Sequence, residues 1–363
     1  MVVSRKSVCL PSACLAAALA ACLSLCVSAL TALPAAAADL FVNADGSGDY
    51  PTIQAAFDAA APGDVIRLGP GTYRDSHTRT VTDFDGDLTT TTSVAFITPN
   101  VSIEGTSGAD FTIIDGEGTH RCLTGVDLGD VQVRDITFLD GLANGTGSLI
   151  RKAAGGLVME GASSALVEDC YFYRCAAPEV GIDGSGGLYF LNSSTAEARR
   201  NTFLECFGGD LGGAMGVYLV NFVLIENNTF VNNEAGDKGG ALAVNASGGQ
   251  VTANVFFGNT AANNGGAVGC FNGASFLGTC NLFWQNTAPQ DPNTYRCSFA
   301  VGFQDNLEAD PMFCDASAFD FGLMVGSPAA PGGNCGLRGA LGVTCGPISV
   351  RETTWSQVKS LYR

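Results

Sequence analysis

The side chains best placed to do chemistry in this sequence are acids that recur at a regular spacing in the middle of the chain. Asp183, Asp210 and Asp237 each lie two or three residues before a Gly-Gly pair, and Glu234 and Lys238 lie close to the last of them. If these segments stack as parallel strands, the three aspartates lie about 5 Å apart, where their repulsion favours a bound cation. The three aspartates are therefore candidate calcium ligands, and all five residues are candidates for a binding site, for example for sugar.

Both this acidic group and a second one have a simpler interpretation. Acidic turns keep a glycine-rich surface soluble without binding a metal, and Lys238 alone is a thin basis for a catalytic base. Asp83, Asp85 and Asp87 alternate within a polar segment at residues 75–92 and could also hold calcium. The glycine of that segment is misplaced for the helix–loop–helix calcium motif, so a plain acidic turn is the alternative there.

Composition limits the classes of protein to which the chain can belong. Of its 363 residues 46% are hydrophobic, 15% are charged and 47 are glycine, which indicates a turn-rich β protein with a buried core, not a disordered chain or a helical bundle. Two histidines, His77 and His120, are too few for most zinc enzymes and histidine relays. The formal net charge of −17 makes nucleic acid and anionic lipid poor partners.

The elements that must position the acids come from an internal repeat. A Gly-Gly pair begins at residues 155, 186, 212, 239 and 265, and a phenylalanine follows each pair by 17 or 18 residues, at Phe172, Phe203, Phe230, Phe256 and Phe283. The stretches between these anchors are short, apolar and separated by turn residues, which is typical of strands. A unit of this size cannot bury its apolar face alone and must stack on the next unit. The sequence therefore predicts an all-β, single-stranded parallel β-helix.

Stacking places equivalent residues of successive coils in columns, and the residues of one column have side chains that can interact with one another. Two residues before each phenylalanine lie Cys170, Asn201, Asn228, Asn254 and Asn281, and three residues after it lie Cys175, Cys206, Asn233, Asn259 and Asn286. These columns predict two ladders of hydrogen-bonded amides, with a row of sugar-binding asparagines as the alternative. A third column, with Glu168, Arg199 and Glu226, predicts ion pairs between coils.

The cysteines indicate an oxidising compartment. Four of the 14 precede residue 39, and the other ten form an even set without a Cys-x-x-Cys motif, which favours disulfides over structural zinc. Cys175 and Cys206 share a column on adjacent coils, within the reach of a disulfide, and we expect that bridge. Cys335 and Cys345 bracket a short glycine-rich loop and are the second expected pair.

The chain ends carry different signals. Residues 1–38 have two early basic residues, a long apolar stretch and three alanines at the end, which predicts a secretory signal peptide. A lipoprotein cleavage site at Cys22 and a retained membrane anchor are the alternatives. Removing this segment leaves 16 basic and 35 acidic residues, a formal charge of −19, and we expect no membrane span after it.

The β-helix domain is expected to cover residues 39–346. Residues 52–60 have apolar residues at helical spacing behind a threonine cap, and we expect this short helix to cover the open end of the coil. Residues 347–363 are expected to form a tail with a short helix that starts at Thr354 and packs on the domain, or else an export or attachment signal.

Several motifs resemble known families. Residues 45–50, 52–54 and 71–73, with the sequences DGSGDY, TIQ and GTY, resemble the opening of pectin-lyase-like right-handed β-helices, including pectin methylesterases. The GGAM, GGAL and GGAV segments at residues 212, 239 and 265 resemble the repeats of polymorphic outer-membrane adhesins. The turns at residues 310–313 and 326–329 are similar to those of secreted bacterial β-helix proteins. The resemblance implies a right-handed coil but no esterase activity, because the catalytic motifs of the methylesterases have no counterpart.

These observations lead to three functional hypotheses. The first is a secreted or surface-associated β-helix that recognises an extracellular polysaccharide or a surface partner without catalysis. The second is a polysaccharide lyase or glycoside hydrolase, and the third is a cell adhesin. Calcium is the one cofactor that the sequence suggests.

Overall fold

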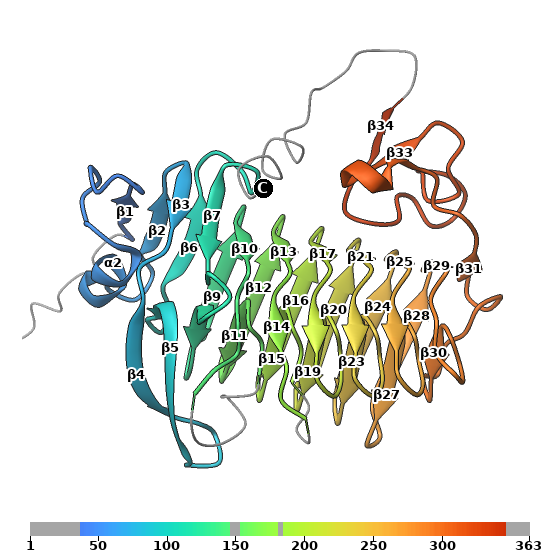
Figure 1. Cartoon of the computed structure of the whole chain (residues 1–363), viewed down its shortest axis with the longest axis horizontal. Coiled ribbons are helices and arrows are strands. Elements are labelled where there is room, and N and C mark those ends of the chain that lie inside the picture. The colour runs from blue at the N-terminus through green and yellow to red at the C-terminus, as the bar shows by residue number, and fades with distance from the viewer. Residues whose placement is uncertain (1–36, 146–152, 181–183, 346–363) are drawn as a thin grey trace, which may run out of the picture. The chain divides into compact units, whose positions relative to one another are not determined.

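Stacked coils of short strands make up the structure, a computed structural model that describes residues 37–145, 153–180 and 184–345. The elements below belong to one compact unit that starts at Ala38. Figure 1 shows the coils side by side along one axis. Each full coil adds one strand to each of three nine-stranded sheets, called sheets A, B and C here, and the predicted parallel β-helix is confirmed.

Sheets A and B are parallel throughout. Sheet A contains β1 (Asp39–Val42), β2 (Val65–Leu68), β6 (Ser102–Gly105), β9 (Gly129–Arg134), β12 (Ala162–Glu168), β16 (Thr195–Arg199), β20 (Phe222–Glu226), β24 (Gly248–Thr252) and β28 (Ser275–Thr279). Sheet B contains β3 (Gly71–Tyr73), β7 (Thr112–Asp115), β10 (Thr137–Leu139), β13 (Tyr171–Tyr173), β17 (Thr202–Leu204), β21 (Thr229–Val231), β25 (Val255–Phe257), β29 (Leu282–Trp284) and β31 (Leu307–Glu308).

Sheet C is parallel except for one antiparallel pair at its start. It contains β4 (His77–Thr82), β5 (Leu88–Ile97), β8 (Arg121–Gly125), β11 (Leu157–Glu160), β15 (Leu188–Leu191), β19 (Met215–Tyr218), β23 (Leu242–Asn245), β27 (Val268–Phe271) and β30 (Thr294–Tyr295). The antiparallel strands β4 and β5 form a hairpin, so the polar segment at residues 75–92 is mostly strand. A small sheet between B and C contains β14 (Ala176–Ala177), β18 (Phe207–Gly208), β22 (Glu234–Ala235) and β26 (Thr260–Ala261).

The core is built from the predicted columns. The five repeat phenylalanines and Phe138 form one buried stack, in which adjacent ring centroids lie 4.7–5.1 Å apart. The glycine pairs let the coils approach closely, because a Cβ on Gly213 would lie 2.1 Å from the Gly240 carbonyl oxygen, and one on Gly240 would lie 2.1 Å from that of Gly266. Any side chain at these positions would force the coils apart.

Both amide ladders are present and buried. In the first ladder the Asn228 Oδ1 accepts hydrogen bonds from the backbone N–H and the Nδ2 of Asn201, and its own Nδ2 donates to Asn254 Oδ1 and the Ala198 carbonyl. The pattern continues through Asn281 to Asn306. The second ladder repeats it from Asn233 to Asn286. The asparagines are therefore structural, and the ladders satisfy backbone groups at each corner of the coil.

The expected disulfide between Cys175 and Cys206 is not formed, and that prediction is wrong. Both cysteines are buried and free, as are Cys122 and Cys170. The thiols continue the ladder where it lacks asparagine: Cys175 Sγ donates to the Phe138 carbonyl at 3.4 Å, and Cys206 Sγ donates to the Phe172 carbonyl at 3.5 Å. Equivalent side chains of stacked coils lie parallel, so each thiol bonds to the preceding coil instead of joining its neighbour.

The expected Cys335–Cys345 pair is also wrong. Three disulfides are formed after residue 269, and they join Cys270 to Cys297, Cys280 to Cys335 and Cys314 to Cys345. Cys335 approaches the coil because the neighbouring Arg338 donates hydrogen bonds to the carbonyls of Cys280 and Pro328. Cys335 and Cys345, which bracket the glycine-rich loop, therefore bond to different cysteines, Cys280 and Cys314.

Two outer faces of the coil are covered by their own chain. A C-terminal segment with β32 (Phe313–Asp315), η1 (Ala316–Ala318), β33 (Asp320–Met324) and β34 (Val343–Cys345) packs Phe313, Phe321 and Leu323 on Val231, Val255 and other outward residues of sheet B. The tip of the β4–β5 hairpin packs Phe84 into an apolar cluster with Val158, Tyr189 and Leu191 on sheet C.

The predicted helix caps the first coil. Helix α2 (Ile53–Ala59) begins after Thr52, whose side chain accepts a hydrogen bond from the Ala55 N–H. Ile53, Ala56 and Phe57 are buried in the main core, at the N-terminal end of the stack (Figure 1). The predicted signal peptide, apart from residues 37 and 38, and the predicted tail at 347–363 lie outside the described residues.

Sheet A carries the ion pairs on its outer face. Arg67, Glu104, Arg134, Glu168, Arg199 and Glu226 occupy one row of paired positions and alternate in sign. Arg67 Nη1 lies 2.5 Å from Glu104 Oε2, and Arg134 and Arg199 lie 3.5 and 3.9 Å from their glutamates. The predicted alternation in sign is confirmed and extends further towards the N-terminus, but Glu168 pairs with Arg134 and Arg200 and not with Arg199. Partly exposed pairs add little stability.

We predict that the Asn228→Ala substitution lowers the free energy of unfolding by about 2–4 kcal/mol, because it leaves two buried donors of Asn201 without an acceptor. Urea unfolding followed by circular dichroism measures the change. The matched control is Asn221→Ala at an exposed turn, which should change stability by less than about 0.5 kcal/mol. Equal losses in both variants would contradict a structural role for the ladder.

We also predict the thiol count of the chain that begins at Asp39. Ellman's reagent should detect almost no thiol in the native protein and four thiols in denaturant without reductant, because four cysteines are buried and six are paired. A count of two in denaturant, with a Cys175–Cys206 peptide in a non-reducing map, would show that the column is oxidised after all.

Candidate functional site

The acids singled out in the sequence lie in the turn that leads into sheet C. Asp210 and Asp237 stack on adjacent coils, because the Asp237 N–H donates to the Asp210 carbonyl at 2.8 Å. Glu234 is exposed at the start of β22, and Lys238 follows Asp237 directly. Asp183 lies outside the described residues. The structure therefore brings two of the three aspartates together as predicted, and the next residue in their column is Asn263.

The Asp237 carboxylate already has partners. It forms an ion pair with Lys238 and accepts a hydrogen bond from Asn263 Nδ2 at 2.5 Å. Partial burial opposes its charged form, but these partners outweigh that effect and hold the pKa of Asp237 below its ordinary value. A calcium ion would have to displace Lys238, so this geometry gives calcium binding at Asp210 and Asp237 no support, and it stays a prediction.

One other group has ligand atoms close enough together for a metal. Among the described residues, the ligand atoms of Cys280, Asp305 and Cys335 lie within 4.8 Å of one another. Cys280 and Cys335 are joined in a disulfide, so their sulfurs cannot act as thiolate ligands. The disulfide of this group instead attaches the C-terminal segment to the coil.

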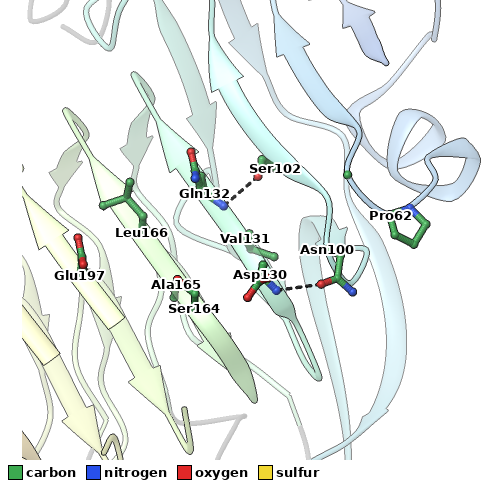
Figure 2. A pocket seen from close by; sticks show the side chains of 11 residues that line it. Pro62, Asn100, Ser102, Asp130, Val131, Gln132, Ser164, Ala165, Leu166 and Glu197 are labelled. Carbon is green, nitrogen blue, oxygen red and sulfur yellow. Dashed lines mark hydrogen bonds between the residues drawn. The ribbon is translucent and has the colours of Figure 1, made fainter. Parts of the chain in front are cut away.

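The described residues form a depression on the outer face of sheet A, drawn in Figure 2. It has a volume of about 630 Å³ and is lined by Pro62, Gly63, Asn100, Ser102, Asp130, Val131, Gln132, Ser164, Ala165, Leu166 and Glu197. Pro62 and Gly63 belong to the loop after α2, and the floor comes from β6, β9, β12 and β16. Its size is within the range of sites that bind small ligands.

Hydrogen bonds hold the floor of the depression in place. The Asp130 N–H donates to Asn100 Oδ1, and the Gln132 N–H donates to Ser102 Oγ, both at 3.0 Å (Figure 2). The Gln132 side chain, Leu166 and Glu197 are in register on three successive strands, with Ser102 before them. The lining thus presents hydroxyl, amide and carboxylate groups in a row that follows the axis of the coil.

This arrangement is suited to binding a polyol. Hydroxyl, amide and carboxylate groups exchange hydrogen bonds with polyols, and Leu166 offers an apolar patch. Glu197 is paired with Arg199, whose Nη2 lies 2.6 Å from Glu197 Oε2, so Asp130 supplies the negative charge of the lining, which disfavours anionic ligands.

Sequence reasoning missed this depression. Much of its lining, from Pro62 to Gln132, comes from the early coils before the Gly-Gly pair at residue 155, where the repeat that defined the columns is absent. The sequence signal that could have found it is the alternation along residues 129–134, 162–168 and 195–199, where every second residue points outward from the coil. Only the register between these strands shows that the outward residues form one row.

The fold and this open face define a β-solenoid that presents side chains from successive coils on one surface. Residues 100–287, half of the chain, match the family model described as a right-handed beta helix region. The chain therefore belongs to this family of right-handed β-helix proteins. A search of curated proteins finds no match, so the family gives the fold without an activity.

Two further observations bear on the environment of the protein. Three disulfides favour an extracellular or otherwise oxidising compartment. Within residues 37–145, 153–180 and 184–345, no helix has the length and hydrophobicity needed to cross a bilayer.

Proposed function

We propose that this protein is a recognition module that binds an extended polysaccharide along the outer face of sheet A. The observation that carries the proposal is the row of hydrogen-bonding side chains, Ser102, Gln132 and Glu197, in one open depression. Neighbouring strands are about 4.8 Å apart, which is close to the length of one sugar ring in an extended chain. A glycan that runs along the axis therefore meets equivalent positions on successive coils.

The chemistry of the site favours a neutral or basic glycan. Asp130 lines the depression, Glu197 is paired there with Arg199, and the chain as a whole carries a net charge of −17. An acidic polysaccharide would meet repulsion both locally and at long range. The disulfides support a secreted or surface location, where such a glycan would be available.

We predict that the mature protein is retained on neutral or amino-sugar polysaccharides and that acidic polysaccharides retain it less. Affinity electrophoresis with a glycan panel measures this directly. The combined Gln132→Ala and Glu197→Ala substitutions should weaken binding at least tenfold, because each removes a hydrogen bond worth about 1 kcal/mol. Gln290→Ala is the matched control, since Gln290 is an exposed glutamine outside both sheet A and the depression.

Other results of the same panel would replace the proposal. Unsaturated products or new reducing ends would show a lyase or a glycoside hydrolase, and cell binding without glycan dependence would show an adhesin. Retention that is equal in the double variant and in Gln290→Ala would place the glycan elsewhere on the protein.

A further inference from the structure

The outward residues of sheet A repeat every two coils. In the row that contains Gln132, a leucine occupies every second strand and a polar residue occupies each strand between. From β9 to β28 the paired residues of this row are Gln132, Leu166, Glu197, Leu224, Gln250 and Leu277. Figure 2 shows the first three of them on adjacent strands. Residues of the same kind in this row are therefore about 10 Å apart.

A second outward row has the same period. Two residues further along each strand from β9 to β20 lie Arg134, Glu168, Arg199 and Glu226. Each arginine shares its strand with a polar residue of the first row, and each glutamate shares its strand with a leucine. Over these four strands, successive coils therefore present two different surfaces in turn.

Stacking of the coils explains one of these rows but not the other. Like charges on adjacent strands repel, so the charged row has to alternate in sign. Leucines on adjacent strands would instead pack together favourably. The inward row from Val133 to Val251 does have an apolar residue on every strand. The alternation of leucine with polar residues on the outer face consequently does not follow from the stacking.

The row is accessible, and its character suits an uncharged ligand. Gln132 and Gln250 are exposed, and Leu277 is 47% exposed. Polar residues separate the leucines, so the leucines do not form the continuous apolar patch that is typical of a protein–protein interface. Arg199 pairs with Glu197 and Glu226 at 2.6 and 3.9 Å, which compensates charge along the face.

A polysaccharide with β-1,4 linkages has the matching geometry. Both bonds that join each glucose-type ring to its neighbours are equatorial, so the chain is straight, and each ring is turned over relative to the ring before it. The same edge of the sugar therefore recurs at every second ring, at close to the distance of about 10 Å that two coils span. Linkages of the α-1,4 and β-1,3 types bend the chain into a helix and lose this match.

We propose that the outer face of sheet A binds an uncharged β-1,4-linked polysaccharide of glucose-type sugars, with one ring on each coil and one disaccharide on each pair of coils. This inference rests on the proposed function and specifies its ligand. Leu166 and Leu224 contact the apolar C–H groups of every second ring. Gln132 and Glu197 exchange hydrogen bonds with the hydroxyl groups of the rings between.

The test is calorimetry of the full mature protein with hexasaccharides. Cellohexaose, maltohexaose and laminarihexaose all consist of glucose and differ only in their linkages, which are β-1,4, α-1,4 and β-1,3. Chitohexaose, made of N-acetylglucosamine, is a second β-1,4 chain. We expect at least one of the two β-1,4 chains to bind at least tenfold more tightly than maltohexaose and laminarihexaose. Its affinity should rise from the disaccharide to the hexasaccharide as more coils are engaged.

Two leucine substitutions test the row itself. The combined Leu166→Ala and Leu224→Ala substitutions should weaken binding of the preferred hexasaccharide at least tenfold, because both side chains lose apolar contact with the sugar. Leu88→Ala is the matched control and should leave the affinity unchanged, since Leu88 is an exposed leucine of the β4–β5 hairpin. Thermal unfolding followed by circular dichroism verifies that the variants are folded.

The possible results separate this inference from the proposed function. Equal affinity for all four hexasaccharides, or a preference for the α-1,4 or β-1,3 chain, would overturn the β-1,4 assignment and leave glycan recognition intact. Undiminished binding in the double leucine variant, or no binding of any hexasaccharide, would also overturn it, whereas the proposed function fails only if the whole glycan panel fails. Self-association that the double leucine variant abolishes would instead assign this face to a second copy of the chain.

Discussion

The hydrogen bonding of each coil to the next, in register, is the constraint on which the rest of this structure depends. It forces the same position of successive coils into a column about 4.8 Å apart, so a residue must tolerate a near copy of itself above and below. Phenylalanine, asparagine and glycine meet this condition in different ways: rings stack, amides bond to amides, and glycine leaves room for the adjacent backbone. Charged residues meet it only by alternating in sign, as they do on sheet A.

This constraint explains what could be predicted from the sequence. The repeat of Gly-Gly and phenylalanine defines the columns between residues 155 and 286, and both asparagine ladders follow from it. The helix at residues 53–59 was predictable because its cap and its apolar spacing are local. The disulfides were not, since proximity in a column does not orient two thiols towards each other, and the true partners of Cys335 and Cys345 depend on the path of the C-terminal segment.

The candidate site was less predictable than the fold for a related reason. Inward positions repeat because they share one core, whereas outward positions are free to differ from coil to coil. The C-terminal segment uses outward residues of sheet B as a packing surface, and the hairpin tip does the same on sheet C. On sheet A the outward residues of the early coils instead form a polar depression. Which face is covered and which is accessible depends on segments that do not belong to the repeat.

The distribution of the three disulfides has a consequence for how the molecule comes apart. All three lie after residue 269, where they lock the last coils and the C-terminal segment together, while the first coils rely on helix α2 and on noncovalent contacts. In a solenoid each coil is supported by its two neighbours, so loss of structure starts where the end is weakest. Under heat or mechanical load, this chain should peel from its N-terminal end one turn at a time, and the cross-linked end should hold longest.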